Sequence, residues 1–132
     1  MSRTRILIVE DEPIVSRDIQ HTIVSLGYEV AATASSGEEA VKKAAEWTPD
    51  LVLMDIVLKG DMDGLEAAAC IQAQRKVHVV YISAHNERGI LDRSKLTYPY
   101  SYVMKPFTDR ELATAIEVAL SNHQINQGLK LE

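Results

Sequence analysis

The sequence is poor in cysteine, and its apolar runs are short. A single cysteine, Cys70, excludes an internal disulfide and a zinc site built from several cysteines. We expect it to act as a small packing residue on a helix. No apolar run approaches the roughly 20 residues that a membrane-spanning helix needs, and the apolar stretch near the N-terminus is too short for a secretory signal. These features predict a cytoplasmic protein without membrane insertion.

A strong positive charge is also lacking. The 14 lysines and arginines are outnumbered by 19 acidic residues, which gives a formal net charge of −5. Proteins that bind nucleic acid usually present a basic surface to the phosphate backbone, so this composition argues against a nucleic-acid partner. With 132 residues, of which 46% are hydrophobic and 25% charged, the chain suits one compact domain with a single core.

Two patterns alternate along the chain. Continuous apolar runs, typical of strands buried on both faces, lie at residues 6–9, 28–33, 51–54, 77–82 and 102–104. Helical spacing follows each run, in segments that begin near residues 13, 36, 63, 86 and 108. Ser36 and Thr108 are each followed three residues later by a glutamate, which predicts a capping box for the second helix and for the last.

The alternation predicts an α/β domain of the (βα)₅ type. Because crossovers between parallel strands are right-handed, the result is a parallel five-stranded sheet between two layers of helices. We expect this domain to cover residues 1–123. Residues 124–132 are expected to form a short C-terminal tail, with no output domain.

Polar side chains gather where the predicted strands end. Glu10 and Asp11 follow the first strand, Asp55 the third, Ser83 the fourth and Lys105 the fifth. In a doubly wound sheet these ends share one edge, where ligands bind. Carboxylates about 4 Å apart repel by about 4 kcal/mol at an effective dielectric near 20. A divalent cation would relieve that repulsion, and all-oxygen ligands favour Mg²⁺ or Mn²⁺.

The other groups at this edge suit a phosphoryl group. Lys105 brings a positive charge and Ser83 a hydroxyl donor, while an aspartate can be a nucleophile that forms an aspartyl-phosphate. Taken singly, each residue has an ordinary structural explanation, as a turn acid, a helix cap or a solvated lysine. Four strands that each deliver a suitable group to the same edge favour a phosphoryl-transfer site, where positioning and electrostatics supply most of the catalysis.

These residues resemble the receiver domain of two-component response regulators. The resemblance covers residues 5 to about 122, and the matching motifs occur in the family's order: ILIVEDE, DLVLMDI, MDGLEA, VVYISA and YVMKPF. It implies the flavodoxin-like fold, a doubly wound three-layer sandwich with strand order 2-1-3-4-5. It also implies a stand-alone phosphorylation switch that catalyses its own phosphorylation and dephosphorylation and is not a classical turnover enzyme.

The resemblance assigns roles at the acidic end of the site. Asp55 would be the phosphoacceptor, taking the phosphoryl group from a phosphohistidine on a sensor histidine kinase or a histidine phosphotransfer protein. Asp11 would bind Mg²⁺ directly, and Glu10 directly or through water. Asp55 and the backbone carbonyl of Val57 would complete the protein ligands.

It also assigns roles to the residues that respond to phosphorylation. Ser83 would hydrogen-bond the phosphoryl group and Lys105 would pair with it, with a cis bond between Lys105 and Pro106. Tyr102 would follow Ser83 inward and change the surface formed by the fourth predicted helix (residues 86–95), the fifth predicted strand and the last predicted helix, the face through which a homodimer could form. His85, two residues after Ser83, is a candidate for tuning the phosphoryl lifetime, or an exposed loop histidine.

The sequence departs from the commonest family pattern in the loop after the phosphoacceptor. Many members have a proline where this chain has Lys59-Gly60, and Gly64 lies nine residues beyond Asp55 instead of the more usual eight. The longer, proline-free loop is expected either to alter kinase docking or to be tolerated without a functional effect.

Two other classes of function compete. A magnesium-dependent phosphatase or phosphotransferase could use Asp55 on small substrates, but such haloacid-dehalogenase-like enzymes place a second aspartate two residues after the nucleophile, and Val57 stands there. A flavin or nucleotide binder would need a glycine-rich phosphate loop after the first strand. That turn reads VEDEP, which is acidic and should repel anions.

Overall fold

A parallel sheet of five strands forms the centre of the protein. The computed structural model describes residues 3–84 and 101–130. The strands are β1 (Arg5–Val9), β2 (Glu29–Ala34), β3 (Leu51–Asp55), β4 (His78–Ala84) and β5 (Ser101–Lys105). Every neighbouring pair is parallel, as the sequence pattern predicts, and their order is β2-β1-β3-β4-β5, as the resemblance to receiver domains implies.

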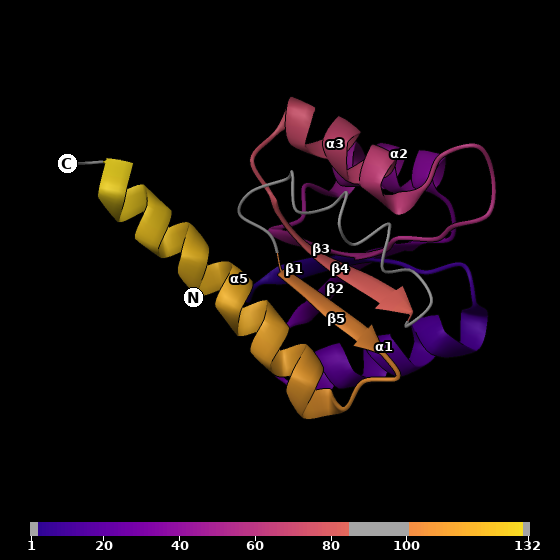
Figure 1. The fold of residues 1–132 in the computed structure, drawn as a ribbon, viewed down its shortest axis with the longest axis horizontal. Coiled ribbons are helices and arrows are strands. Elements are labelled where there is room, and N and C mark those ends of the chain that lie inside the picture. The colour runs from indigo at the N-terminus through magenta and orange to yellow at the C-terminus, as the bar shows by residue number, and fades with distance from the viewer. Residues whose placement is uncertain (1–2, 85–100, 131–132) are drawn as a thin grey trace.

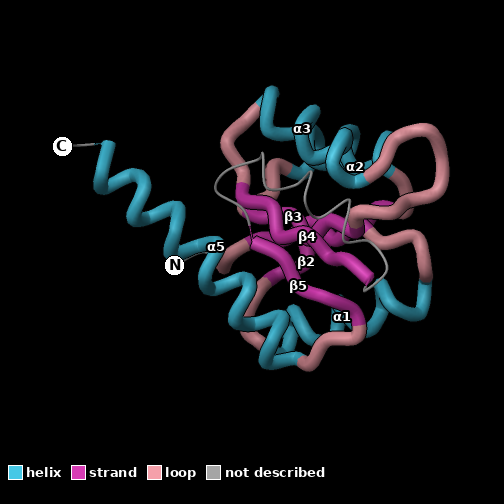
Figure 2. The backbone as a smooth tube through the Cα atoms, viewed as in Figure 1, coloured by secondary structure: helices cyan, strands magenta, loops and turns pink. Residues whose placement is uncertain are grey.

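The helices lie on both faces of this sheet, as Figures 1 and 2 show. They are α1 (Pro13–Ser25), α2 (Gly37–Trp47), α3 (Gly64–Gln74) and α5 (Asp109–Lys130). Residues 124–130, predicted as a short tail, therefore continue α5. The helix predicted at residues 86–95 lies outside the described residues. No helix within the described parts of the chain is long and apolar enough to cross a membrane.

The sheet buries a separate apolar layer on each face. Leu7 and Val9 of β1 belong to the cluster that packs under α2 and α3, whereas Ile6 and Ile8 belong to the one that packs under α1 and α5. All four side chains are fully buried. Because both faces are covered, successive residues of β1 must all be apolar, which explains the unbroken runs in the sequence.

Reciprocal capping boxes begin two helices that flank the site. At α5, Glu111 accepts from the Thr108 N–H at 2.9 Å and Thr108 Oγ1 accepts from the Glu111 N–H at 3.1 Å, as predicted. At α3, Asp63 accepts from the Glu66 N–H at 2.8 Å and Glu66 accepts from the Asp63 N–H at 2.9 Å. Each box satisfies two N–H groups that the helix leaves unpaired.

Two expectations about helix side chains are wrong. Ser36 accepts from the Glu39 N–H, but the Glu39 carboxylate turns to the N–H and hydroxyl of Ser35, at 2.7 and 3.1 Å, so the predicted box at α2 is not reciprocal. Cys70 is exposed and does not pack in the core. The buried stripe of α3 runs through Ala68 and Ile71, which turns Cys70 toward solvent.

Candidate functional site

The carboxyl ends of β1, β3, β4 and β5 bring the predicted site residues to one edge of the sheet. Asp55 is the last residue of β3 and pairs with Ile82 of β4, while Ala84 of β4 pairs with Lys105, the last residue of β5. Ser83 lies between these two paired positions on β4. The parallel register therefore places these groups side by side, although they come from distant parts of the sequence.

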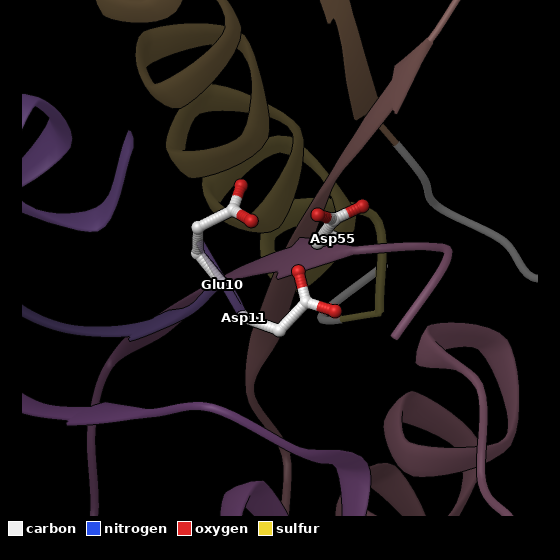
Figure 3. Close-up of side chains that lie close together, drawn as sticks. All are labelled: Glu10, Asp11 and Asp55. Carbon is white, nitrogen blue, oxygen red and sulfur yellow. The ribbon is translucent and has the colours of Figure 1, made fainter. Parts of the chain in front are cut away.

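Three carboxylates converge at this edge. Glu10, Asp11 and Asp55 each offer an oxygen atom, and these atoms all lie within 4.8 Å of one another; Figure 3 shows the side chains directed into a shared space. Glu10 is only 2% exposed and Asp55 only 4%, so water screens their charges weakly. Negative charges held this close in a poorly solvated site repel one another and favour a bound cation.

Lys105 supplies positive charge beside this cluster. Its Nζ lies 3.0 Å from Glu10 Oε1 and 3.2 Å from Asp55 Oδ2, and 3.9 Å from a carboxylate oxygen of Glu12. One ammonium group thus contacts two buried carboxylates. It offsets part of the negative charge but cannot neutralise three acids.

The protonation equilibria reflect this imbalance. Burial, and then the neighbouring charge of Glu10, raise the pKa of Asp55 to about 7, although Lys105 acts in the opposite direction. Burial alone would lower the pKa of Lys105. Its hydrogen bond to Glu10 and the charges of Asp55 and Glu10 raise that pKa above its ordinary value instead, so the lysine stays charged.

Each carboxylate of the cluster also accepts one backbone N–H. Glu12 donates to Glu10 at 3.1 Å, Val57 donates to Asp55 at 3.2 Å, and Lys59 donates to Asp11 at 3.1 Å. The first two bonds are local, between residues two apart, whereas the third joins residues 48 apart. The sequence gives no sign of the Lys59 contact beyond the fact that a residue other than proline stands at that position.

Close backbone packing fixes the loop that follows Asp55. A Cβ atom at Gly64 would overlap the backbone carbonyl of Asp55 and lie 2.8 Å from the Cα of Ile56. The Gly64 N–H donates to the Ile56 carbonyl at 2.7 Å, which closes the loop at the start of α3. Only glycine allows this approach, and it holds the backbone beside the candidate phosphoacceptor.

Of the remaining predicted residues, Ser83 and Val57 lie at the same edge, and Tyr102 lies three residues before Lys105 on β5. Ser83 is fully buried, the side chain of Tyr102 is 48% exposed, and the Lys105–Pro106 bond is cis, as expected. Val57 is 45% exposed, at the mouth of the site. His85 lies outside the described residues.

Comparison with known proteins shows to which family the chain belongs. The model of the response regulator receiver domain matches residues 6–117. The chain belongs to the response regulator receiver family. It is 36% identical over 117 residues to the transcriptional regulatory protein PdtaR of Mycobacterium tuberculosis, covering 89% of this chain and 57% of PdtaR. It is 34% identical to the chemotaxis protein CheY of Listeria monocytogenes, covering 87% of this chain and 97% of CheY.

Solved structures agree with the architecture. The receiver domain of a modulated diguanylate cyclase from Desulfovibrio desulfuricans superposes with a TM-score of 0.84 at 32% identity, over 92% of this chain and 97% of that one. The receiver domain of PhyR from Erythrobacter litoralis gives 0.80 at 37% identity, over 91% and 92%. The doubly wound three-layer fold is therefore confirmed, and the chain spans little more than half the length of relatives such as PdtaR.

The residues present fit the divalent cation that receiver domains typically use. Three carboxylates within 4.8 Å form an all-oxygen donor set, which suits Mg²⁺ and also Mn²⁺. The excess of buried negative charge over the single lysine is what such a cation would neutralise. The acidic cluster is thus compatible with Mg²⁺ binding.

Proposed function

We propose that this protein is a cytoplasmic phosphorylation-activated signalling switch in which Asp55 accepts a phosphoryl group. One observation carries the proposal: a nearly buried aspartate shares its site with two further carboxylates and a lysine whose Nζ lies 3.2 Å from its oxygen. This combination pairs a nucleophile with a cation-binding cluster and a positive group for the phosphoryl oxygens. Membership of the receiver family supports the same assignment.

In the proposed reaction, an oxygen of the ionised Asp55 carboxylate attacks phosphorus. A phosphohistidine on a sensor histidine kinase or a phosphotransfer protein is the proposed donor: the new O–P bond forms, the N–P bond breaks, and its electron pair returns to the imidazole nitrogen. Bound Mg²⁺ would neutralise the carboxylates and the charge on the transferring group. Glu10, Asp11, Asp55 and the carbonyl of Val57 would hold it.

The phosphoryl group would then change the contacts of the neighbouring strands. Lys105 would exchange its contact with Asp55 for one with a phosphoryl oxygen, and the Ser83 hydroxyl would donate to another. Tyr102, which lies three residues before Lys105 on β5 and pairs with Tyr81 of β4, would alter its side-chain position in response. The affected surface would be the face of the predicted fourth helix, β5 and α5, where a partner protein or a second copy would bind.

The competing reading, a phosphatase or phosphotransferase that acts on small substrates, gains no support at the site. Such an enzyme needs an acid or base two residues after its nucleophile to act on the leaving group. That position is Val57, an apolar side chain 45% exposed at the mouth of the site. Repeated turnover of a free metabolite would therefore lack its proton donor.

Incubation with acetyl phosphate and Mg²⁺ tests the proposal. Intact-mass measurement should show the addition of one phosphoryl group to the wild-type protein and none to Asp55→Asn. Beryllofluoride with Mg²⁺ should shift the amide resonances of β4 and β5 in the wild type alone. Equal labelling of the variant would show that another residue is the acceptor, and an unmodified wild type with unchanged spectra would refute the switch.

A further inference from the structure

A hydrogen bond joins the loop after Asp55 to the end of β1. The backbone N–H of Lys59 donates to Asp11 Oδ2 at 3.1 Å, across 48 residues of sequence. By contrast, Glu10 and Asp55 each accept from the backbone N–H of the residue two positions later, Glu12 and Val57, so these donors move together with their acceptors. The orientation of Asp11 thus depends on a different segment of the protein, the β3–α3 loop of residues 56–63.

The packing of this loop sets the place of the Lys59 N–H independently of Asp11. Gly60 has φ = +100°, a backbone conformation that favours glycine. Beyond it, Met62 packs against the first residue of α2: a Cβ added to Gly37 would lie 2.9 Å from the Met62 side chain. The capping box of Asp63 then fixes the far end of the loop to α3. The donor is therefore held in position by α2 and α3 before any ligand arrives.

We propose that the backbone N–H of Lys59 is a positioning donor that orients Asp11 as a cation ligand, so that the β3–α3 loop sets the cation affinity of the site. The inference rests on the proposed function, since it takes the carboxylate cluster as the Mg²⁺ site. A hydrogen bond to one carboxylate oxygen restricts the rotation of the group and thereby directs its second oxygen.

Outer partners of this kind matter for metal binding. Groups that hold a metal ligand in place typically contribute about 10-fold to 100-fold to metal affinity. The side chain of Lys59 has no part in this contact, so the effect should follow the N–H and not the identity of the side chain. Proline, which lacks the N–H, is the substitution that separates the two.

Magnesium titration of two variants at one position tests the proposal. Lys59→Pro removes the donor, and Lys59→Ala keeps it while removing the lysine side chain. By calorimetry, Lys59→Pro should bind Mg²⁺ at least about 10-fold more weakly than the wild type, and Lys59→Ala should stay within about 2-fold. Wild-type affinity in Lys59→Pro, or an equal loss in both variants, would overturn the inference.

Hydrogen exchange supplies a readout that does not depend on a proline folding into the loop. In metal-free protein, Asp11→Ala should accelerate exchange of the Lys59 amide about 10-fold and shift its proton resonance upfield, while the Val57 amide keeps its rate. An unchanged Lys59 amide would overturn the proposal even if Lys59→Pro failed to fold.

The phosphorylation switch and the role of the Lys59 N–H can be refuted separately. A wild type that binds Mg²⁺ but is never phosphorylated refutes the switch alone. Normal phosphorylation together with a Mg²⁺ affinity that Lys59→Pro leaves unchanged refutes only the role of the Lys59 N–H.

Discussion

Lys105 Nζ lies 3.2 Å from Asp55 Oδ2, in a contact that joins β5 to β3 across 50 residues of sequence. The strand between them, β4, carries Ser83. Any change in charge at Asp55 must therefore alter the contact that holds the end of β5. This geometry gives the candidate phosphoacceptor a direct physical connection to the strand that carries Tyr102.

Replacing the lysine should destabilise the metal-free protein. Lys105→Met keeps a long side chain but removes the charge that lies between Glu10 and Asp55, which leaves two buried carboxylates unbalanced. We expect the free energy of unfolding to fall by about 1–2 kcal/mol at pH 7 without Mg²⁺, with part of the loss recovered when Mg²⁺ is added. Urea denaturation with and without Mg²⁺ measures both effects.

Lys76→Met is the control for this substitution. Lys76 is exposed in the turn before β4, so loss of its charge should change the stability by less than about 0.5 kcal/mol. A Lys105 variant as stable as this control, or one indifferent to Mg²⁺, would contradict the electrostatic account of the site.

The raised pKa of Asp55 predicts an unusual pH dependence. Its native pKa of about 7 lies above the ordinary value of 3.8, so the folded protein holds this proton more tightly than the unfolded chain does. The resulting stability is fully present below about pH 4 and is lost as the pH rises through 7. Relative to Asp55→Asn, the metal-free wild type should lose about 1–3 kcal/mol between pH 4 and pH 8.

Urea denaturation of both proteins in the presence of a chelator, at several pH values, gives this difference. Taking the difference between wild type and variant removes the contribution of carboxylates elsewhere in the protein, such as Glu39, whose pKa is lowered by its hydrogen bond to the Ser35 N–H. Mg²⁺ should flatten the curve, because a cation ligand must be ionised. A pH-independent difference would mean that Asp55 is already ionised at low pH and that Lys105 dominates over burial.

Most of the fold and the grouping of Glu10, Asp11, Asp55 and Lys105 could be predicted because both follow from the order of the parallel strands. Wherever strands are parallel and buried on both faces, the residues that follow them meet at one edge. The contact of Lys59 with Asp11 could not be predicted, since it depends on the path of a loop rather than on a repeating pattern.

The buried side of a helix and the exact donors at its first turn were likewise not predictable from local sequence. Cys70 lies only one residue from the buried Ile71, and the apolar composition of α3 does not reveal which side faces the sheet. Likewise Ser36 and Glu39 have the spacing of a capping box, but the extended backbone before α2 brings the Ser35 N–H nearer to the Glu39 carboxylate. Local spacing predicts the start of a helix, whereas the exact donor depends on how the chain enters it.

The start of α3 should matter to stability. Asp63→Ala removes the carboxylate that accepts from the Glu66 N–H, while the backbone N–H of residue 63 can still donate to Glu66, and it should lower the free energy of unfolding by about 1 kcal/mol. Asp61→Ala, an exposed acid in the same loop, is the matched control and should change it by less than about 0.5 kcal/mol. Chemical denaturation measures the free energy of unfolding of both variants. Equal decreases would show that Asp63 stabilises the protein through its charge and not through capping of α3.

Gly64 should be required for phosphorylation as well as for stability. A methyl group at this position meets the backbone of Asp55 and Ile56, which cannot rotate away as a flexible side chain could. Gly64→Ala should therefore displace the Asp55 backbone, lower the free energy of unfolding by about 2 kcal/mol and reduce the rate of labelling by acetyl phosphate several-fold.

Gly27→Ala separates the two effects of that substitution. Gly27 has φ = +94°, so alanine there is strained and should cost about 1 kcal/mol, but no atom lies within 4 Å of the added carbon and the position follows α1, away from the site. Intact-mass time courses at a temperature where both variants are folded should show slow labelling of Gly64→Ala and a wild-type rate for Gly27→Ala. Equal rates would mean that the close approach at Gly64 serves folding alone and does not position the phosphoacceptor.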